Sequence, residues 1–501
     1  MRKTMLIIIL ILTMLLLVAC NAEAEAYEEE GYVEEIEDVV EEVEETEEVQ
    51  EMTEEWVLQG LTAQHFLEDL DYMLYVLENN FALFDVAYWA RGVDIYAIVD
   101  DIRTEIDRNS DMDIDEFFDV LALGFSPLVS IAHFGLVTPN RHHDIVNDPN
   151  AWENMFFTQT ALARLQQPHV MAFYEPRHGQ PQNPDILMTR AVAEVDIIVN
   201  VLTWHGEHQL AEEIVQAIEN GDNERATEIL EIATEMRANS PNVTMRIMEE
   251  GRAAYLTFDT FWNIPWVGSE IDEQILGFFE EIRDYEHLIV DLRRTFGGSP
   301  ENFFIYVMGP NIEHNYRSNA YIFSQNGTYA AEYAELAVRR ALISPRVLSI
   351  DRELRPIAEM LEEFDISDLN MADMVRMNHG HRAQIQVNTR RSPQFDNQPA
   401  FGGQIWLLTS PQMGSAVQIA AWVAKDTGFA TLVGDITGGV YGGPRTFVAL
   451  PNSGIAFQMD LFYVTDSDGR PLEAGTIPHY FNREGMDALE TVLAMIKEGV
   501  Y

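Results

Sequence analysis

A glycine–serine pair marks the first segment of this sequence that could carry out covalent chemistry. Ser415 follows Gly414 where an apolar run ending at Thr409 gives way to a helical pattern over residues 416–427. The N–H groups at the start of a helix stabilise nearby negative charge, either on a serine oxygen or on the oxyanion formed when a serine attacks a carbonyl. A serine here is also a common helix cap. The segment therefore predicts either an activated serine or an ordinary cap.

Paired glycines mark a second junction of this kind. The run 287–292 is nearly all apolar, as in a strand buried in a parallel sheet, and Gly297 and Gly298 follow it. Glycines let the backbone turn sharply and approach a ligand, and such a loop exposes N–H groups that can form an oxyanion hole. An ordinary strand-to-helix turn capped by Ser299 fits the same pattern. The sequence leaves both interpretations open.

Histidines supply the candidate bases and metal ligands. His133 lies in residues 129–137, which we predict to be a strand or an extended loop, and it is either a general base or a buried, hydrogen-bonded histidine. Two further groups offer metal-ligand types, namely His142-His143-Asp144 and His379-Gly380-His381. Neither has the H-x-x-x-H spacing of a helical zinc site or a convincing third ligand. We therefore expect no metal and no other cofactor.

The spacing of apolar residues predicts which elements position these candidates, and this spacing changes along the chain. Apolar residues recur at three- and four-residue spacings from Trp56 to about Leu123, which predicts helices, and Asp113 with Glu116 forms a capping-box pattern. The second half alternates short apolar runs with helical patterns, which predicts an α/β core with right-handed crossovers. The predicted strands are 253–258, 287–292, 405–409 and 430–434, and the predicted helices include 210–218, 224–236, 272–285 and 416–427.

The start of the chain predicts export and lipid attachment. A short basic segment precedes an apolar run over residues 5–17, and the following Leu17-Val18-Ala19-Cys20 resembles the lipobox read by bacterial lipoprotein signal peptidase. The run is short for a helix crossing about 30 Å of hydrocarbon, although an uncleaved membrane helix is the alternative. Cys20 is the only cysteine, so no internal disulfide can form. We predict that Cys20 is the lipidation site and not a nucleophile.

Acidic residues dominate the segment that follows. Residues 21–55 contain 18 Asp and Glu and no Lys or Arg, and the whole chain has a formal charge of −52. Like charges keep such a segment extended, so we interpret it as a tether, with calcium or partner binding as the alternative. The negative charge of the chain argues against nucleic acid and anionic lipid head groups as partners.

Taken in order, these segments resemble the S41 peptidase family, which includes the C-terminal (tail-specific) processing proteases and the tricorn core protease. The motifs begin with His133-Phe134-Gly135-Leu136 and continue to the end of the chain. They are Asp291-Leu292-Arg293 with Gly297-Gly298, Ser415-Ala416 with Ile419, Ala421 and Asp426, Val433-Gly434-Asp435, Thr437-Gly438-Gly439, and residues 468–478. This resemblance implies an α/β fold with a ClpP/crotonase-like core and an N-terminal helical subdomain.

The resemblance also implies roles for individual residues. Ser415 would be the acyl nucleophile, and Ala416 would donate one oxyanion N–H. Gly297 or Gly298 would donate the second. His133 would be the base, and Glu473 matches the late glutamate of the tricorn-like branch.

Several positions depart from the family pattern. Val440 stands where tail-specific proteases place their catalytic lysine, so the resemblance is to the histidine-dependent branch. Ile131 and Ala132 precede His133 where relatives often have Asp-Gly or a serine, so the residue that orients the imidazole is left open between Glu473 and Ser130. No PDZ domain is evident between His133 and residue 253.

We therefore predict an extracytoplasmic serine peptidase that cleaves a peptide or protein substrate through an acyl-enzyme. It would contact the membrane only through its lipid anchor. The alternative is a catalytically inactive S41-like lipoprotein that binds a peptide or another ligand. The predicted parts are a signal peptide (1–19), an acidic disordered tether (20–55), a helical subdomain carrying His133 (56–140), a helical middle region (141–245) and the α/β catalytic core (246–501).

Overall fold

The computed structural model describes residues 60–129, 131, 133–147, 157–180, 207–238, 242–261, 267–329, 354–439 and 445–500, together with 183, 186, 195, 198, 199, 202, 332 and 348–350. The chain divides into two units, Met1–Trp56 and Val57–Tyr501, and all described residues belong to the second. The predicted signal peptide, Cys20, the acidic tether, Ser130, Ala132 and Val440 lie outside the described residues. Within the described part of the chain, no helix is long and apolar enough to cross a membrane.

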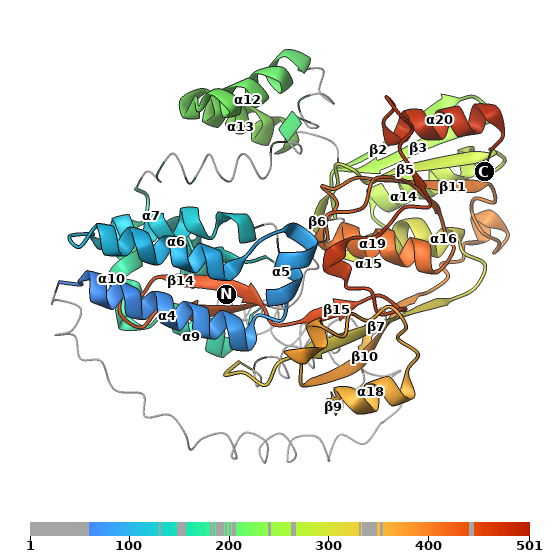
Figure 1. Ribbon diagram of the computed structural model, residues 1–501. Helices are drawn as coiled ribbons and strands as arrows, with labels where there is room; N and C mark the ends of the chain where they lie inside the picture. Colours follow the sequence, from blue (N-terminus) through green and yellow to red (C-terminus); the bar gives the residue numbers. More distant parts are fainter. Residues whose placement is uncertain are drawn as a thin grey trace, which may run out of the picture. The chain divides into compact units, whose positions relative to one another are not determined.

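Four helices form the N-terminal part of the described chain (Figure 1, blue to cyan). They are α4 (Ala63–Asn80), α5 (Phe84–Arg91), α6 (Ile95–Arg108) and α7 (Ile114–Gly124). Their apolar faces meet in one core, where the ring of Phe66 stacks on that of Phe117 at 4.4 Å between centroids. The predicted capping box is confirmed, because the Asp113 carboxylate accepts from the Glu116 N–H and the Glu116 carboxylate accepts from the Asp113 N–H.

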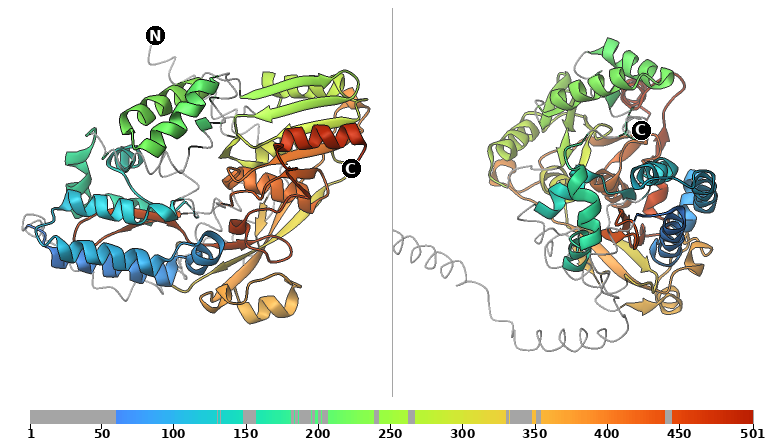
Figure 2. Two further views of the ribbon diagram at one scale, coloured as in Figure 1. Left: turned by 45° about the horizontal axis from the view of Figure 1, so that its top comes forward. Right: turned by 90° about the vertical axis from the view of Figure 1, so that its left-hand side faces the viewer.

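A second set of helices follows in the chain. It consists of α8 (Pro139–Asn147), α9 (Gln159–Leu165), α10 (Pro168–Tyr174), α12 (His208–Asn220) and α13 (Asn223–Ala238). Helices α12 and α13, which contain the predicted helices 210–218 and 224–236, pack on each other as a hairpin (Figures 1 and 2, green). Their apolar cluster, which includes Ile214 and Ile229, is separate from the main core.

A six-stranded sheet forms the centre of the second half. Its strand order is β16-β12-β11-β5-β3-β2, and all neighbours are parallel except β2 and β3. The strands are β2 (Val243–Glu249), β3 (Ala253–Phe258), β5 (His287–Asp291), β11 (Gln404–Thr409), β12 (Thr431–Gly434) and β16 (Tyr480–Phe481).

Helices cover both faces of this sheet, which explains the near-continuous apolar runs of its strands. Ile289 and Trp406 point to the face covered by α20 (Ala488–Glu498) and pack in the cluster that contains Val492. Their chain neighbours, such as Val290, point to the opposite face and join the main core with α14 (Glu270–Glu281) and α19 (Ser415–Asp426). Adjacent residues of one strand thus reach different cores.

The other described strands form three smaller sheets. One has the order β15-β7-β10-β8 with β9 beside β10, one has the order β1-β14-β13, and one pairs β4 with β6. Their bounds are β15 (Tyr463–Thr465), β7 (Tyr316–Ser324), β10 (His379–Val387), β8 (Leu348–Ile350), β9 (Arg355–Pro356), β1 (Gly135–Leu136), β14 (Ala456–Asp460), β13 (Arg445–Ala449), β4 (Thr260–Phe261) and β6 (Phe296–Gly298). The remaining short helices are η1 (Ser126–Leu128), η3 (Glu175–Arg177), α15 (Pro300–Phe303), η4 (Phe304–Met308), α16 (Gly309–Asn311), α18 (Ile357–Glu363), η5 (Asp373–Val375), η6 (Pro393–Phe395) and η7 (Leu472–Ala474).

The sheet β1-β14-β13 joins distant parts of the chain. Strand β14, from the C-terminal part, lies beside the N-terminal helices in Figures 1 and 2. The contact is specific, because the carboxylate of buried Asp69 on α4 accepts from the N–H groups of Asn452 and Ser453 in the turn between β13 and β14. This sheet brings the segment around His133 to the C-terminal part of the chain.

The predicted α/β core with an N-terminal helical region is confirmed. The four predicted core strands match β3, β5, β11 and β12 to within one residue. The helix predicted over 272–285 runs from Glu270 to Glu281 and ends in a turn. The prediction of a strand or extended loop over 129–137 is correct only in part, because strand pairing is limited to Gly135–Leu136.

Candidate active site

Ser415 lies at the junction of β11 and α19, where the chain turns from the sheet into a buried helix. Gly414 is the N-cap and Ser415 is the first helical residue, so the interpretation of Ser415 as an ordinary cap is wrong. Its φ is +53°, a conformation that costs a non-glycine residue roughly 1–2 kcal/mol. The side chain is half-buried. A strained serine at a helix N-terminus fits a nucleophile, since surrounding contacts must maintain the strain.

Gly297, the first glycine of the pair, lies directly against this serine. A methyl group placed on Gly297 would be 3.5 Å from both Cβ and Oγ of Ser415, so the Gly297 backbone borders the serine side chain. Gly298 has a φ of +124°, which favours glycine. Ala416 is the second residue of α19, where backbone N–H groups have no intrahelical acceptor. The Gly297 backbone and the start of α19 therefore border the Ser415 side chain from two segments.

A turn after β12 supports the serine backbone. The Ser415 N–H donates to the Gly439 carbonyl at 3.2 Å, and the Gly438 N–H donates to the Met413 carbonyl at 2.8 Å. The turn over Thr437–Gly439 is therefore fastened to both sides of Gly414.

Gln418, one turn along α19 and fully buried, holds the same turn from inside the protein. Its side-chain amide donates to the hydroxyl of Thr476 at 2.9 Å, and its amide oxygen accepts from the hydroxyl of Thr437. The Thr476 N–H donates in turn to the Thr437 hydroxyl at 2.7 Å. The network links α19, the turn over Thr437–Gly439 and the segment after Glu473.

His133 is held by strand β14. It too has a φ of +53°, and its Nδ1 lies 3.2 Å from Oδ2 of Asp460, a buried residue. The Gln458 side-chain amide donates to the His133 carbonyl at 2.7 Å, and Arg141 donates to the Gln458 amide oxygen at 3.2 Å. Residues two apart on one strand face the same side, so β14 fixes both the ring and the backbone of His133.

Asp460 is a candidate functional residue that the sequence analysis missed. It carries no motif, and the only signal is that polar Gln458 and Asp460 alternate with the apolar residues of a short strand. The Asp460 contact occupies Nδ1 and leaves Nε2 as the nitrogen for a reacting serine. No hydrogen bond joins Ser415 Oγ to His133, both of which are described.

Glu473 lies near the turn that accepts the Ser415 N–H. It is buried in η7, and its carbonyl faces the turn at Gly439. The partner of the His133 ring is Asp460, not Glu473. The catalytic role of Glu473 stays a prediction.

Three histidines of the two candidate metal motifs have protein partners. His142 is buried, its Nε2 lies 2.8 Å from the Leu165 carbonyl, and its ring stacks on Tyr174. The His143 ring stacks on that of His178, and His379 Nδ1 lies 3.1 Å from the Asn326 side-chain oxygen. In the described part of the chain, no group of three His, Cys, Asp or Glu side chains is placed to hold a metal ion.

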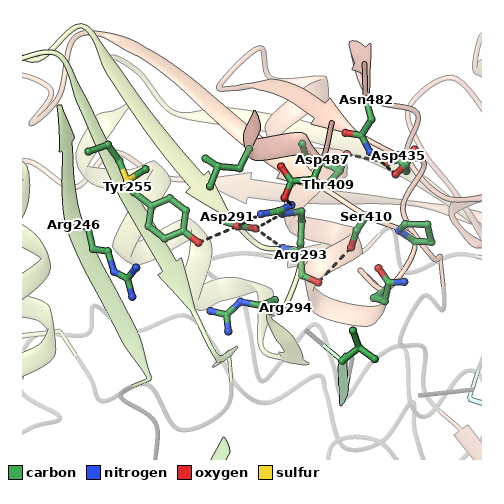
Figure 3. Close-up of a pocket in the computed structure, with 16 residues that line it drawn as sticks. Arg246, Tyr255, Asp291, Arg293, Arg294, Thr409, Ser410, Asp435, Asn482 and Asp487 are labelled. Atoms are coloured by element: carbon green, nitrogen blue, oxygen red, sulfur yellow. Dashed lines mark hydrogen bonds and ion pairs between the residues drawn. The ribbon is translucent and has the colours of Figure 1, made fainter. Parts of the chain in front are cut away.

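A cavity of about 570 Å³ lies at the carboxyl ends of the parallel strands (Figure 3). Asp291, Thr409 and Asp435, at or just after the ends of β5, β11 and β12, line it. Ser415 is not among the lining residues. The cavity instead borders the first residues of the two loops that lead to Gly297 and Ser415.

Charges at the cavity wall are paired. The Asp291 carboxylate accepts from the guanidinium of Arg293 and from the hydroxyl of Tyr255 at 2.9 Å (Figure 3). Burial and the Asp291 charge raise the pKa of Tyr255, so the hydroxyl stays protonated and donates. Burial lowers the pKa of Arg293, but hydrogen bonds and charge from Asp291 and Asp487 outweigh it and raise the pKa above its ordinary value. These pairs fasten the Asp291-Leu292-Arg293 motif as a structural support.

Comparison with known proteins gives a sequence match for part of the chain. Residues 252–481 match the sequence model of Peptidase family S41. A search of curated proteins finds no match.

Solved structures similar to the chain include a putative peptidase from Parabacteroides merdae (14% identity, 87% of this chain and 97% of that chain, TM-score 0.44). They also include mature CPAF complexed with lactacystin (12% identity, 87% and 97%, TM-score 0.43) and a lipoprotein from Streptococcus agalactiae (10% identity, 64% and 97%, TM-score 0.29).

The S41 match covers just under half of the chain and includes Gly297, Ser415, Asp460 and Glu473, whereas His133 lies outside it. Residues 252–481 therefore carry the sequence pattern of peptidase family S41.

Proposed function

We propose that this protein is a serine peptidase of the S41 type that hydrolyses peptide bonds through an acyl-enzyme. The observation that carries the proposal is the conformation of Ser415, a strained, half-buried serine at a helix N-terminus with the Gly297 backbone against its side chain. The S41 match over residues 252–481 supports the reaction class and a peptide or protein substrate.

In the proposed reaction, Ser415 Oγ forms a bond to the substrate carbonyl carbon while His133 Nε2 takes its proton. The N–H groups of Ala416 and of Gly297 or Gly298 stabilise the oxyanion. The carbon–nitrogen bond then breaks, and His133 passes the proton to the leaving amine. Water, activated by the same imidazole, hydrolyses the acyl-enzyme and regenerates the serine.

Asp460 is the carboxylate best placed to orient His133. Its contact with Nδ1 fixes the tautomer that leaves Nε2 unprotonated, and it stabilises the imidazolium that forms during attack. Because Ser415 and His133 share no hydrogen bond, substrate binding has to bring the two side chains together. Catalytic hydrogen bonds are often long before substrate binds.

The test is covalent labelling with a serine-directed phosphonate combined with a peptide hydrolysis assay. We expect the wild-type protein to be labelled at Ser415 and both Ser415→Ala and His133→Ala to lose hydrolysis while keeping their thermal stability. If purified Ser415→Ala still hydrolyses peptides, the proposal is wrong.

The second candidate is an S41-like protein that binds a peptide or another ligand without cleaving it. Ser415 and His133 both belong to the described part of the chain, and no hydrogen bond joins their side chains, which favours this candidate. A protein that binds peptides with unchanged affinity after Ser415→Ala, and that is never labelled by the phosphonate, would support this candidate.

We further propose that the protein is anchored outside the cytoplasm by lipid on Cys20. The apolar segment and the Leu17-Val18-Ala19-Cys20 sequence support this, and the acidic segment 20–55 would be the tether. Radiolabelled palmitate should be incorporated into the wild-type protein but not into Cys20→Ser, which should leave the membrane fraction. Equal membrane retention of an unlabelled variant would instead favour an uncleaved membrane helix.

A further inference from the structure

One arginine of the N-terminal helices reaches the turn that supports the serine. Arg91 is the last residue of α5, and its side chain donates to the carbonyl of Gly438 and, at 3.1 Å, to the carbonyl of Glu473. The two carbonyls belong to the turn after β12 and to η7, so a single guanidinium joins both segments. A Cβ on Gly439 would lie 3.0 Å from Arg91 Nη2, which shows how closely the guanidinium approaches this turn.

The contact is two hydrogen-bonded steps from the nucleophile. Arg91 holds the Gly438 carbonyl, and the next residue, Gly439, accepts the Ser415 N–H. The hydrogen bond between Gly438 N–H and the Met413 carbonyl ties the same turn to the residue before Gly414. A shift of the turn would therefore move the backbone on both sides of Gly414 and let the strained Ser415 relax.

Two sets of contacts thus fix the turn from opposite sides. Gln418, with the two threonines Thr437 and Thr476, holds it from the buried interior. Arg91 is exposed and holds it from a helix that lies more than 340 residues earlier in the chain. Both hydrogen bonds come from Nη2, whose two N–H groups allow one guanidinium nitrogen to donate to both carbonyls.

We propose that Arg91 is a positioning residue that keeps Ser415 in its reactive conformation, an inference that rests on the proposed peptidase function. Arg91 does not touch the reacting atoms. Through the Gly438 and Glu473 carbonyls it makes the geometry of the nucleophile depend on the docking of α5. The N-terminal helices would then influence both reactive groups, since they also contact the sheet that holds His133.

The experiment compares Arg91→Ala and Arg91→Lys with a matched control, Arg103→Ala. Arg103 is a similarly accessible arginine on α6 that pairs with Asp71 and lies outside the site. We expect Arg91→Ala to lower kcat and the rate of phosphonate labelling at Ser415 together, each roughly 10- to 100-fold, with little change in KM or Tm. Arg91→Lys should fall between the wild type and Arg91→Ala, because an ammonium keeps a charged N–H donor but lacks the planar guanidinium that fixes the direction of the two Nη2 hydrogens.

A rescue measurement separates positioning from general stability. Methylguanidinium at a non-denaturing concentration should restore part of the labelling rate of Arg91→Ala and leave Arg103→Ala and the wild type unchanged. Full activity in Arg91→Ala, or a loss that follows Tm and is not rescued, would overturn the inference. If Ser415→Ala still hydrolyses peptide, the proposed function fails instead, so the two failures are distinguishable.

Discussion

The Ser415 side and the His133 side of the candidate site are built in different ways. Ser415 lies between elements that are neighbours in sequence, as β11, a glycine N-cap and α19 follow one another within some twenty residues. His133 sits outside any long regular element, and Asp460, 327 residues later, orients its ring. Both residues nevertheless have a φ of +53°. Similar strain is therefore maintained at Ser415 by a helix start with a supporting turn and at His133 by a distant strand.

The largest expected effect tests the nucleophile. Ser415→Ala should lower the rate of peptide hydrolysis by at least about 10⁴-fold, because no other group supplies the attacking oxygen. Activity and phosphonate labelling would also be measured for Ser367→Ala as a control, since Ser367 is an exposed serine in a different segment of the chain. If both variants lose activity equally, the effect is not specific to the nucleophile.

The next effect tests which carboxylate serves the base. Asp460→Asn should lower kcat by roughly 10³- to 10⁴-fold, because an amide stabilises the wrong tautomer and no imidazolium charge. Glu473→Gln should have a smaller effect on kcat, since Glu473 is not the ring partner of His133. Steady-state kinetics of both variants decide the matter, and a larger loss for Glu473→Gln would assign the orienting role to the residue predicted from the sequence.

A smaller effect is expected from crowding at the oxyanion position. Gly297→Ala keeps the backbone N–H but places a methyl 3.5 Å from Ser415 Oγ, where substrate and oxyanion must fit. We expect kcat/KM to fall by about 10- to 100-fold with little change in Tm. Gly298→Ala should also lower Tm, because its φ of +124° strains any residue with a Cβ. Equal Tm values for the two variants would contradict this distinction.

The smallest effect is expected from Asp69, which connects α4 to the sheet that holds His133. Asp69 accepts two backbone N–H groups from the β13–β14 turn, and an asparagine can accept only one of them. Asp69→Asn should lower the free energy of unfolding by about 1–3 kcal/mol in chemical denaturation.

The pH dependence of this effect has a defined sign. Burial raises the pKa of Asp69, so the folded state holds the proton more tightly than the unfolded chain. The contribution of wild-type Asp69 to stability therefore falls as pH rises from its ordinary value of 3.8 through the folded pKa. Asp69→Asn should lack this slope, and an identical pH profile would show that the carboxylate is not the source.

Short stretches of sequence are enough to predict several strands and candidate residues of this protein. The apolar runs predict β3, β5, β11 and β12, because strands that are covered on both faces have few polar residues. Glycines at the ends of strands mark Gly297 and Ser415 as candidate site residues. The type of residue and its place at a strand or helix end are properties of a few neighbouring residues. These can be recognised from one sequence.

The residues that support Ser415 and His133 are brought to them by contacts between distant parts of the chain. Asp460 faces His133, and Arg91 reaches Gly438 across 347 positions, because strand pairing and helix docking bring these segments together. Such pairings depend on the burial of the whole core and leave no local signature. The sequence alone could therefore propose Ser415 and His133, whereas the groups that hold each of them in position emerged from the packing of the folded chain.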